Sequence, residues 1–364
     1  MNILFIGPYR QNDGWGIAAR DYARALATTD HNLTIRPIYM SNHIDNNIPK
    51  DLLGLEQNDY KSYDVVIQKV LPHLFHFDYN YKIIGLFTTE TGQLQHTPWI
   101  RYINLLNMAM VPSGVEINNL RDSGVNIPIC PISEPIDITK YNKVYPRLDI
   151  IKDTFNFYFI GEHTDRKNIK ALIIAFHLAF QKNEPVNLVL KVNSSKRQQL
   201  EKDIEEIKRT LRLYYTLNMY KKEIIIAEHL PEEILYGLHQ SCHCLVMPSR
   251  GEAFCRPVVD AMGFGNPSII TNGTGMTDYI DNGIGYLTDS ITAPVYTSEP
   301  PLPFLYTGRE TWEDIDILSL AEDMRHIYDN PKIRKEMSQK CKERVNQFSY
   351  DHIGQRINSA LESL

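Results

Sequence analysis

Two acidic residues, Glu252 and Asp260, lie eight positions apart in the stretch from His243 to Ile280. Glu252 stands in a polar, glycine-containing loop, and Asp260 stands inside the helix that we predict over residues 255–264. The free N–H groups and the dipole of a first helical turn attract anions, and carboxylates beside them accept hydrogen bonds from hydroxyl groups. A phosphate flanked by two polyols is a nucleotide sugar, and this pattern favours one. The alternative is that both acids are solvated surface residues.

The elements around these acids are those of a parallel α/β sheet. The apolar run Cys244–Met247 predicts a buried strand, and residues 268–270 predict the next one. Pro257 fits the first turn of the intervening helix, where its missing N–H costs nothing. The loop that carries Glu252 is therefore expected at the carboxyl edge of the sheet, where open α/β sheets bind ligands.

The residues from 251 to 267 follow the pattern Gly-Glu-Ala-Phe-x-x-Pro-x-x-acid-Ala-Met-x-x-Gly-x-Pro. This pattern resembles the nucleotide-sugar signature of the family-4 retaining glycosyltransferases, also called glycosyl transferases group 1. The resemblance implies that Glu252 contacts the donor sugar in catalysis and that Asp260 contacts the ribose. It also implies donor contacts for the residues after the first acid: Ala253, Phe254, Cys255 and Arg256. The family usually has Glu at the second position, and Asp260 is shorter by one methylene group.

Two cations, Arg166 and Lys167, precede the helix that we predict over residues 169–181. The helix dipole disfavours cations at this end, so their placement favours an anionic ligand such as a pyrophosphate over solvated side chains. The triplet Arg166-Lys167-Asn168 matches the family's phosphate-binding position. The chain departs from the family at Glu162, where many members have a second arginine.

Two further segments are predicted to contact the donor. Gly14 and Gly16 follow a strand predicted over residues 2–6, a Rossmann-type opening in which they let the backbone approach a donor phosphate. A plain turn is the alternative. In the family, the loop that here contains His229 and Leu230 packs against the nucleotide base through backbone groups.

Glu90 and His96 are the acceptor-side candidates. Glu90 follows the strand predicted over residues 82–88, and His96 lies in a loop before Pro98. A strand-end glutamate followed by a Pro-Trp helix resembles one branch of the same family, which implies catalytic or acceptor-side support from Glu90. The alternatives are that Glu90 caps a turn and that His96 is an exposed loop histidine.

The chain of 364 residues suits two α/β domains. The resemblance implies the GT-B fold, in which two Rossmann-like domains face each other across a cleft and the last helix crosses back to the first domain. We expect an N-terminal acceptor-side domain over 1–150, a nucleotide-sugar-binding domain over 151–348 and the returning helix over 349–364. Residues 138–153 are predicted to be a linker, residues 41–62 an irregular surface segment, and residues 289–312 an irregular excursion, either a lid or a surface loop.

The composition limits the kinds of partner that we expect this protein to bind. The net charge of −6 gives no reason to expect nucleic acid, and no apolar run approaches the roughly 20 residues that span a bilayer. The five cysteines include no CxxC pair, which favours reduced thiols in the cytoplasm and no metal site. Weak peripheral membrane association and the choice between a monomer and a homodimer stay open.

The resemblance, together with these features, implies a retaining, metal-independent glycosyltransferase of carbohydrate biosynthesis. It would move a sugar from a UDP- or GDP-sugar, a substrate and not a cofactor, to an unidentified acceptor: a glycan, a glycolipid or a small molecule. The alternatives are a catalytically silent nucleotide-sugar-binding subunit and a nucleotide-sugar epimerase of the same fold.

Overall fold

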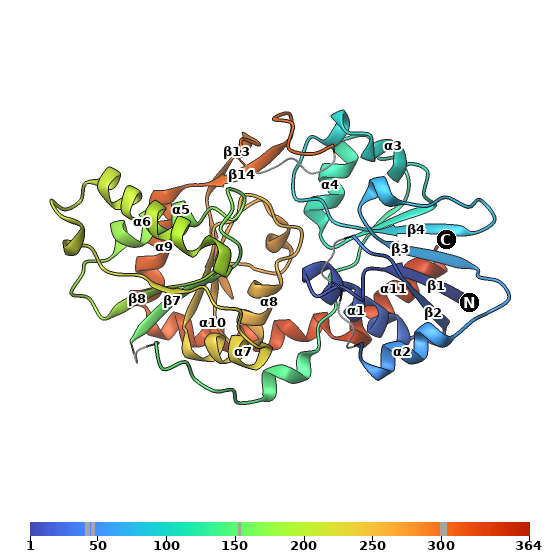
Figure 1. Ribbon diagram of the computed structural model, residues 1–364, viewed down its shortest axis with the longest axis horizontal. Helices are drawn as coiled ribbons and strands as arrows, with labels where there is room; N and C mark the ends of the chain where they lie inside the picture. Colours follow the sequence, from blue (N-terminus) through green and yellow to red (C-terminus); the bar gives the residue numbers. More distant parts are fainter. Residues whose placement is uncertain (41–43, 45–47, 152–153, 299–303) are drawn as a thin grey trace. The chain divides into compact units, whose positions relative to one another are not determined.

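The computed structural model describes residues 1–40, 44, 48–151, 154–298 and 304–364. The chain divides into two compact units (Figure 1). Unit 1 comprises Met1–Ile138, Leu302–Glu310 and Asn346–Leu364, and unit 2 comprises Thr139–Pro301 and Thr311–Val345. Parts of the segments predicted over 41–62, 138–153 and 289–312 lie outside the described residues.

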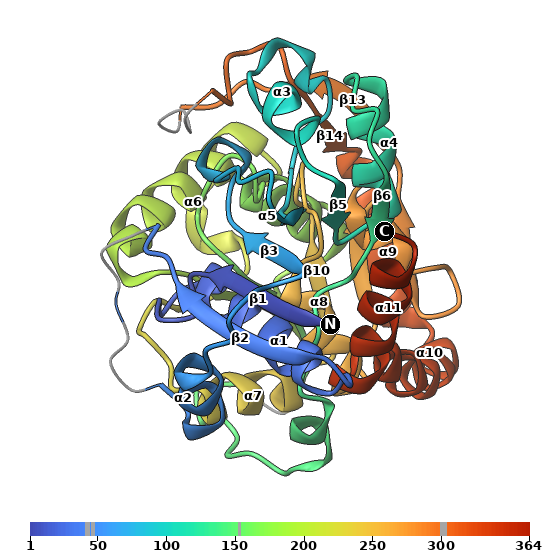
Figure 2. The ribbon, with the colours of Figure 1, turned by 90° about the vertical axis from the view of Figure 1, so that its right-hand side faces the viewer.

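Unit 1 is built on a sheet of six parallel strands in the order β2-β1-β3-β4-β5-β6. Figure 2 shows β2, β1 and β3 side by side with α1 and α11 nearby. The strands are β1 (Asn2–Gly7), β2 (Asn32–Pro37), β3 (Val65–Lys69), β4 (Lys82–Leu86), β5 (Met108–Val111) and β6 (Ile129–Pro131). The α-helices of the N-terminal part are α1 (Gly14–Ala27), α2 (Lys50–Gln57), α3 (Trp99–Ile103) and α4 (Gly114–Asp122).

The last helix, α11 (Tyr350–Glu362), belongs to unit 1. Ile353 and Ile357 enter the same core cluster as the strands β1 and β2, and the Tyr350 hydroxyl donates to Asp21 Oδ1 of α1 at 2.6 Å. Gly354 permits this packing, since a Cβ there would lie 2.5 Å from the Ala25 carbonyl oxygen. The return of the C-terminal helix to the N-terminal sheet, expected from the sequence, is confirmed.

Unit 2 has a second sheet of six parallel strands in the order β12-β11-β10-β7-β8-β9. The strands are β7 (Phe155–Ile160), β8 (Val186–Lys191), β9 (Ile224–Ile226), β10 (Cys244–Met247), β11 (Ser268–Thr271) and β12 (Gly285–Thr288). The helices are α5 (Ile169–Ala179), α6 (Arg197–Leu211), α7 (Glu232–Ser241), α8 (Arg256–Gly263), α9 (Ile317–Asp329) and α10 (Pro331–Arg344). The prediction of an α/β fold with two parallel sheets is confirmed.

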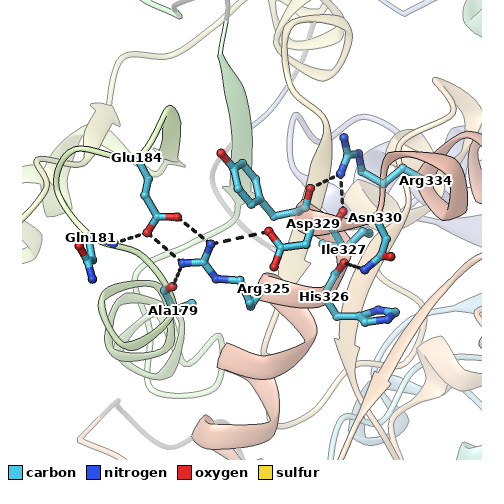
Figure 3. A network of polar contacts seen from close by, with 10 residues as sticks. Ala179, Gln181, Glu184, Arg325, His326, Ile327, Asp329, Asn330 and Arg334 are labelled. Carbon is cyan, nitrogen blue, oxygen red and sulfur yellow. Dashed lines mark hydrogen bonds and ion pairs between the residues drawn. The ribbon is translucent and has the colours of Figure 1, made fainter.

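An arginine network fastens α9 near the amino end of β8 (Figure 3). Arg325 makes two ion-paired hydrogen bonds to the Glu184 carboxylate, at 2.7 and 2.9 Å, and its guanidinium lies 4.3 Å from the centroid of the Phe180 ring. Arg334 donates to the Ile327 and Tyr328 carbonyl oxygens at 2.5 Å and so satisfies the end of α9. This network lies at the edge of the sheet opposite to the loops that follow β7 and β10.

Two segments predicted to be irregular contain regular structure. Residues 289–312 include β13 (Ser290–Pro294), which pairs antiparallel with β14 (Thr311–Ile315). The segment 41–62 includes α2, which buries Leu52. Both predictions were wrong in these parts because each element is short, and partners distant in sequence stabilise it.

None of the helices in the described part of the chain is both long and apolar enough to cross a membrane.

Candidate functional site

Glu252 lies in the loop between β10 and α8, and its side chain is almost entirely buried. Lys167 Nζ donates to Glu252 Oε1 at 2.5 Å, and Arg166 Nη1 lies 3.3 Å from the same oxygen. Arg166 also donates to the Gly251 carbonyl oxygen at 2.7 Å. The loops that follow β7 and β10, neighbours in the sheet, are thereby joined at the carboxyl edge. Neither the acid nor the two cations are the solvated side chains of the alternative interpretation.

The electrostatics of this group favour an anion. Burial alone would raise the pKa of Glu252, but Lys167 and then Arg166 outweigh it and hold the pKa below its usual value. Burial would lower the pKa of Lys167, and Glu252 raises it above its usual value instead. All three groups are therefore charged at neutral pH, and two cations against one carboxylate leave one net positive charge.

The N-terminus of α8 lies directly after this group. Ala253, Phe254 and Cys255 have buried side chains, and the Tyr279 hydroxyl donates to the Phe254 carbonyl oxygen. Cys255 has a φ of 72°, a left-handed conformation that a residue with a side chain adopts only at some cost. Arg256 then opens the helix. The side chains of residues 253–255 are thus buried at the start of α8, and their contact with a donor stays a prediction.

Asp260 lies on α8, and its environment was not anticipated. Lys140 Nζ and the Tyr141 hydroxyl both lie 2.8 Å from Asp260 Oδ1. Burial alone would raise the pKa of Asp260, but chiefly Lys140 lowers it below its usual value. Lys140 also lies 4.8 Å from the centroid of the Tyr236 ring. Asp260 is thus not a solvated helix acid. Its carboxylate is bound by Lys140 and Tyr141, which belong to unit 2 as it does.

The segment that supplies Lys140 and Tyr141 was expected to be a linker. It contains a short 3-10 helix, Ile138–Asn142, and the Tyr141 ring packs edge-to-face on Phe264 with centroids 5.2 Å apart. A charged, poorly periodic stretch gives no sign of this packing, because the partners are more than 100 residues away in sequence.

His229 and Leu230 follow β9, the outer strand of the unit 2 sheet. His229 is exposed and Leu230 half-buried, ahead of α7. They share the carboxyl edge with Lys167, but β9 is two strands from β7. A role in contacting the base stays a prediction.

In unit 1, Gly14 and Gly16 begin α1, and Asp13 caps the helix by accepting from the Gly16 N–H at 2.9 Å. A Cβ on Gly16 would lie 2.0 Å from the Gln11 carbonyl oxygen, whereas one on Gly14 would meet open space. Close packing of the turn therefore explains Gly16, and Gly14 is the glycine that leaves room for a ligand.

Glu90 and His96 lie between β4 and α3 in unit 1. Glu90 is half-buried, and the Tyr306 hydroxyl lies 3.4 Å from its Oε2. His96 ends a short 3-10 turn and is exposed, as the alternative interpretation expects. Glu90 and His96 belong to unit 1, whereas Glu252, Lys167 and Arg166 belong to unit 2.

The sequence did not predict a buried polar group that lies beside Glu90. Glu116, on α4, accepts hydrogen bonds from the Thr89 N–H and hydroxyl, and burial raises the pKa of Glu116 to about 8. Lys69, at the end of β3, is 1% exposed and lies 4.5 Å from the centroid of the Trp15 ring. The spacing Ser113-x-x-Glu116 is a capping-box pattern that marks the start of α4, but it does not indicate the bond to Thr89.

Metal ligands were not predicted. Among the described residues, no three His, Cys, Asp or Glu side chains are grouped as the ligands of a metal ion would be. Metal independence of a reaction remains a prediction.

Residues 145–293, which lie in unit 2, match the family described as glycosyl transferases group 1. The chain is 22% identical over 318 residues to an uncharacterized glycosyltransferase, MJ1059, of Methanocaldococcus jannaschii, covering 85% of this chain and 71% of that protein. It is 30% identical over 118 residues to the serotype-specific mannosyltransferase WbdA of Escherichia coli, covering 32% of this chain and 13% of that protein.

Solved structures resemble the whole chain. Anabaena Alr3699/HepE in complex with UDP and glucose is similar with a TM-score of 0.67 at 16% identity, and 100% of each chain is covered. An Escherichia coli protein described as trehalose-6-phosphate, bound with UDP-2-fluoro glucose, has a TM-score of 0.68 at 8% identity, covering 100% of this chain and 99% of that one. These likenesses show the fold, and the expected GT-B class is confirmed.

Proposed function

We propose that this protein is a retaining, metal-independent glycosyltransferase of family 4 that transfers a sugar from a nucleotide-sugar donor to an acceptor. The observation that carries the proposal is the buried group of Glu252, Lys167 and Arg166 at the carboxyl edge of the unit 2 sheet. It lies inside the segment that matches the glycosyl transferases group 1 family.

The diphosphate of the donor would bind at the two cations and the first turn of α8. A diphosphate carries more charge than the one carboxylate that Lys167 and Arg166 now neutralise, so it competes for both cations. Glu252 is then released from Lys167 and can accept hydrogen bonds from the sugar hydroxyls. Binding of the donor and positioning of Glu252 beside the sugar are therefore coupled.

The chemistry requires the nucleoside diphosphate to leave while positive charge grows at the anomeric carbon. Arg166, Lys167 and the N–H groups of α8 stabilise the leaving diphosphate, and the Glu252 carboxylate lies beside the developing cation. Retention follows if the acceptor attacks from the face that the diphosphate leaves. Glu90 and His96 stay the candidates for acceptor-side support.

The donor we propose is a UDP- or GDP-sugar. HepE, similar in fold, was solved with UDP and glucose, and WbdA is a mannosyltransferase, so the ligands and the activity named for these two proteins involve hexoses. The acceptor proposed is a glycan, a glycolipid or a small molecule. A cytoplasmic location, weak peripheral membrane association and a monomeric or dimeric state are proposed on composition alone.

A thermal-shift panel of UDP, GDP, ADP and their sugars tests the donor site. A ligand at 100 times its Kd adds about 2.7 kcal/mol to the free energy of unfolding. No shift with any of the nucleotides would contradict the proposal. Sugar transfer or donor hydrolysis that is lost in EDTA and restored by Mn²⁺ would contradict metal independence.

One observation favours a second candidate, a catalytically silent nucleotide-sugar-binding subunit. Asp260, the expected ribose contact, is bound by Lys140 and Tyr141. Hydrolysis of a bound UDP- or GDP-sugar by the purified chain distinguishes the two functions, because a silent subunit binds the donor without turning it over.

A further inference from the structure

Residues 304–310 lie in unit 1, although the strands on either side of them, β13 and β14, belong to unit 2. We call residues 304–310 the insert tip.

The base of the insert is anchored on the loops that carry the donor-site residues. The Glu313 N–H donates to the Arg250 carbonyl oxygen at 2.8 Å, and Arg250 Nε donates to Asp314 Oδ1 at 2.8 Å. Asp165, next to Arg166, accepts hydrogen bonds from the Ser298 N–H and hydroxyl at 2.8 and 2.9 Å. The strands therefore hold the insert against the residues that flank Arg166 and Glu252.

The insert tip is anchored in the unit 1 core by Leu305. This side chain is 4% exposed and belongs to the core cluster that contains Phe87 and Trp99. Glu310 is fully buried and closes the tip, because its carboxylate accepts from the Thr307 N–H at 2.9 Å and from the Thr307 hydroxyl at 3.1 Å. Within the insert tip, Leu305 and Glu310 are buried whereas Phe304 and residues 307–309 are exposed, so Leu305 fastens an otherwise exposed segment to the core.

The backbone on both sides of Leu305 is strained. Phe304 has a φ of 71° and Tyr306 a φ of 61°. Bulky residues seldom adopt this left-handed region, and they persist there only where the surroundings fix the conformation. Burial of Leu305 supplies that constraint, and the resulting turn directs the Tyr306 hydroxyl to Glu90 Oε2, at 3.4 Å.

We propose that Tyr306 is a positioning residue for Glu90, and that the insert tip fixes the acceptor-side carboxylate of the glycosyltransferase. This rests on the proposed function. Tyr306 acts through Glu90: its hydroxyl donates to the carboxylate and holds one orientation, while its ring packs against the core cluster that contains Leu305. Loss of the hydroxyl leaves the ring, the strained backbone and the donor site in place.

The test uses Tyr306→Phe in the full chain, with Tyr102→Phe as the matched control, since the Tyr102 ring packs against the same core cluster. Two probes are used. UDP-glucose serves in the hydrolysis assay, in which water is the acceptor, and the affinity for UDP is measured by calorimetry. GDP-mannose and GDP replace them if the wild type prefers guanine. Tyr306→Phe should lower the kcat of hydrolysis about five- to tenfold. KM, the Kd of the diphosphate and the melting temperature should stay near the wild-type values, as should every parameter of Tyr102→Phe.

A double-variant cycle separates positioning from a purely structural effect. If Tyr306 acts through Glu90, the residual hydrolysis of Glu90→Gln should fall little further when Tyr306→Phe is added. An unchanged kcat in Tyr306→Phe, or effects of the two variants that multiply, would overturn the inference. A wild-type chain that binds neither UDP nor GDP would instead overturn the proposed function, and this inference with it.

Discussion

The Glu252 carboxylate lies where a donor phosphate is expected to bind, because Lys167 and Arg166 both contact it. An acid buried between two cations has a low pKa and remains charged at neutral pH. It therefore keeps the cations in position, and under the proposed function the more highly charged diphosphate displaces it. Substitutions of the acid and of the cations should then shift diphosphate affinity in opposite directions.

Lys167→Ala should weaken the binding of UDP or GDP, since it removes a cation and leaves Glu252 to repel the phosphates. The expected loss is roughly 1.5–3 kcal/mol, the contribution of one hydrogen bond to a charged group. Isothermal titration calorimetry measures it. Lys170→Ala, an exposed lysine three residues further on, is the control and should leave the affinity unchanged. Equal affinities for the wild type and Lys167→Ala would remove Lys167 from the site.

Glu252→Gln should bind UDP or GDP more tightly than the wild type, because the competing charge is gone while the size is kept. Turnover of the sugar donor should fall by about 10²-fold, as for the loss of one preorganised electrostatic contact in a transition state. Calorimetry and a hydrolysis assay measure the two effects separately. A variant with weaker diphosphate binding and normal turnover would show that Glu252 has a structural role only.

Asp260→Asn should destabilise the fold, because it leaves the Lys140 cation largely buried without its anion. Breaking a buried ion pair costs about 3 kcal/mol or more, which a chemical unfolding curve resolves. Adding Lys140→Met should recover much of that loss, since the unpaired charge is then removed. If Asp260→Asn melts like the wild type but loses diphosphate affinity, the carboxylate is a nucleotide ligand first and a structural anion second.

The strand–loop–helix units were predictable from sequence, because each depends on neighbouring residues. An apolar run followed by a polar loop and a helix-starting proline gives β10, the Glu252 loop and α8 in order. The position of Lys140 was not predictable, since its partner lies 120 residues away and a charged stretch resembles a linker. The burial of Leu305 was not predictable either, because the local sequence does not show which core a distant loop joins.

The loop that carries Glu90 is held in place by a buried acid, Glu116. The loop after β4 is held by Glu116 of α4 through the Thr89 N–H. Burial raises the pKa of Glu116 from its usual 4.5 to about 8. The unfolded chain releases this proton at a lower pH than the folded chain, so the stabilising contribution is complete below about pH 4.5 and is lost as the pH rises to about 8.

Glu116→Gln should therefore flatten the dependence of stability on pH. Between about pH 5 and 8 the wild type should lose about 1.4 kcal/mol of unfolding free energy per pH unit from this group, and the variant should not, since glutamine does not ionise. Urea unfolding at pH 5.5 and 7.5 measures the difference. Asp122→Asn, an exposed acid on the same helix, is the control. Parallel pH profiles for the wild type and Glu116→Gln would show that Glu116 is ionised in the folded protein.

At the scale of the whole molecule, each unit has its own six-stranded sheet, and α11 completes the core of unit 1. The candidate diphosphate site lies in unit 2. A ligand stabilises the structure that binds it, and a packing defect destabilises the core that contains it. The two units should consequently respond to different perturbations.

Gly354→Val tests this, because its Cβ would lie 2.3 Å from Thr28 Oγ1 and 2.5 Å from the Ala25 carbonyl oxygen, which are contacts too close to keep. Hydrogen exchange followed by mass spectrometry should show faster exchange in β1 of the variant and little change in β10. UDP or GDP should slow exchange around β10 and α8 of the wild type, with a smaller effect on β1. Ser359→Val, at an exposed position of the same helix, is the control and should leave both regions unchanged. If Gly354→Val speeds exchange equally in β1 and β10, the two units unfold as one cooperative structure, and the separation of donor binding from the α11 core is wrong.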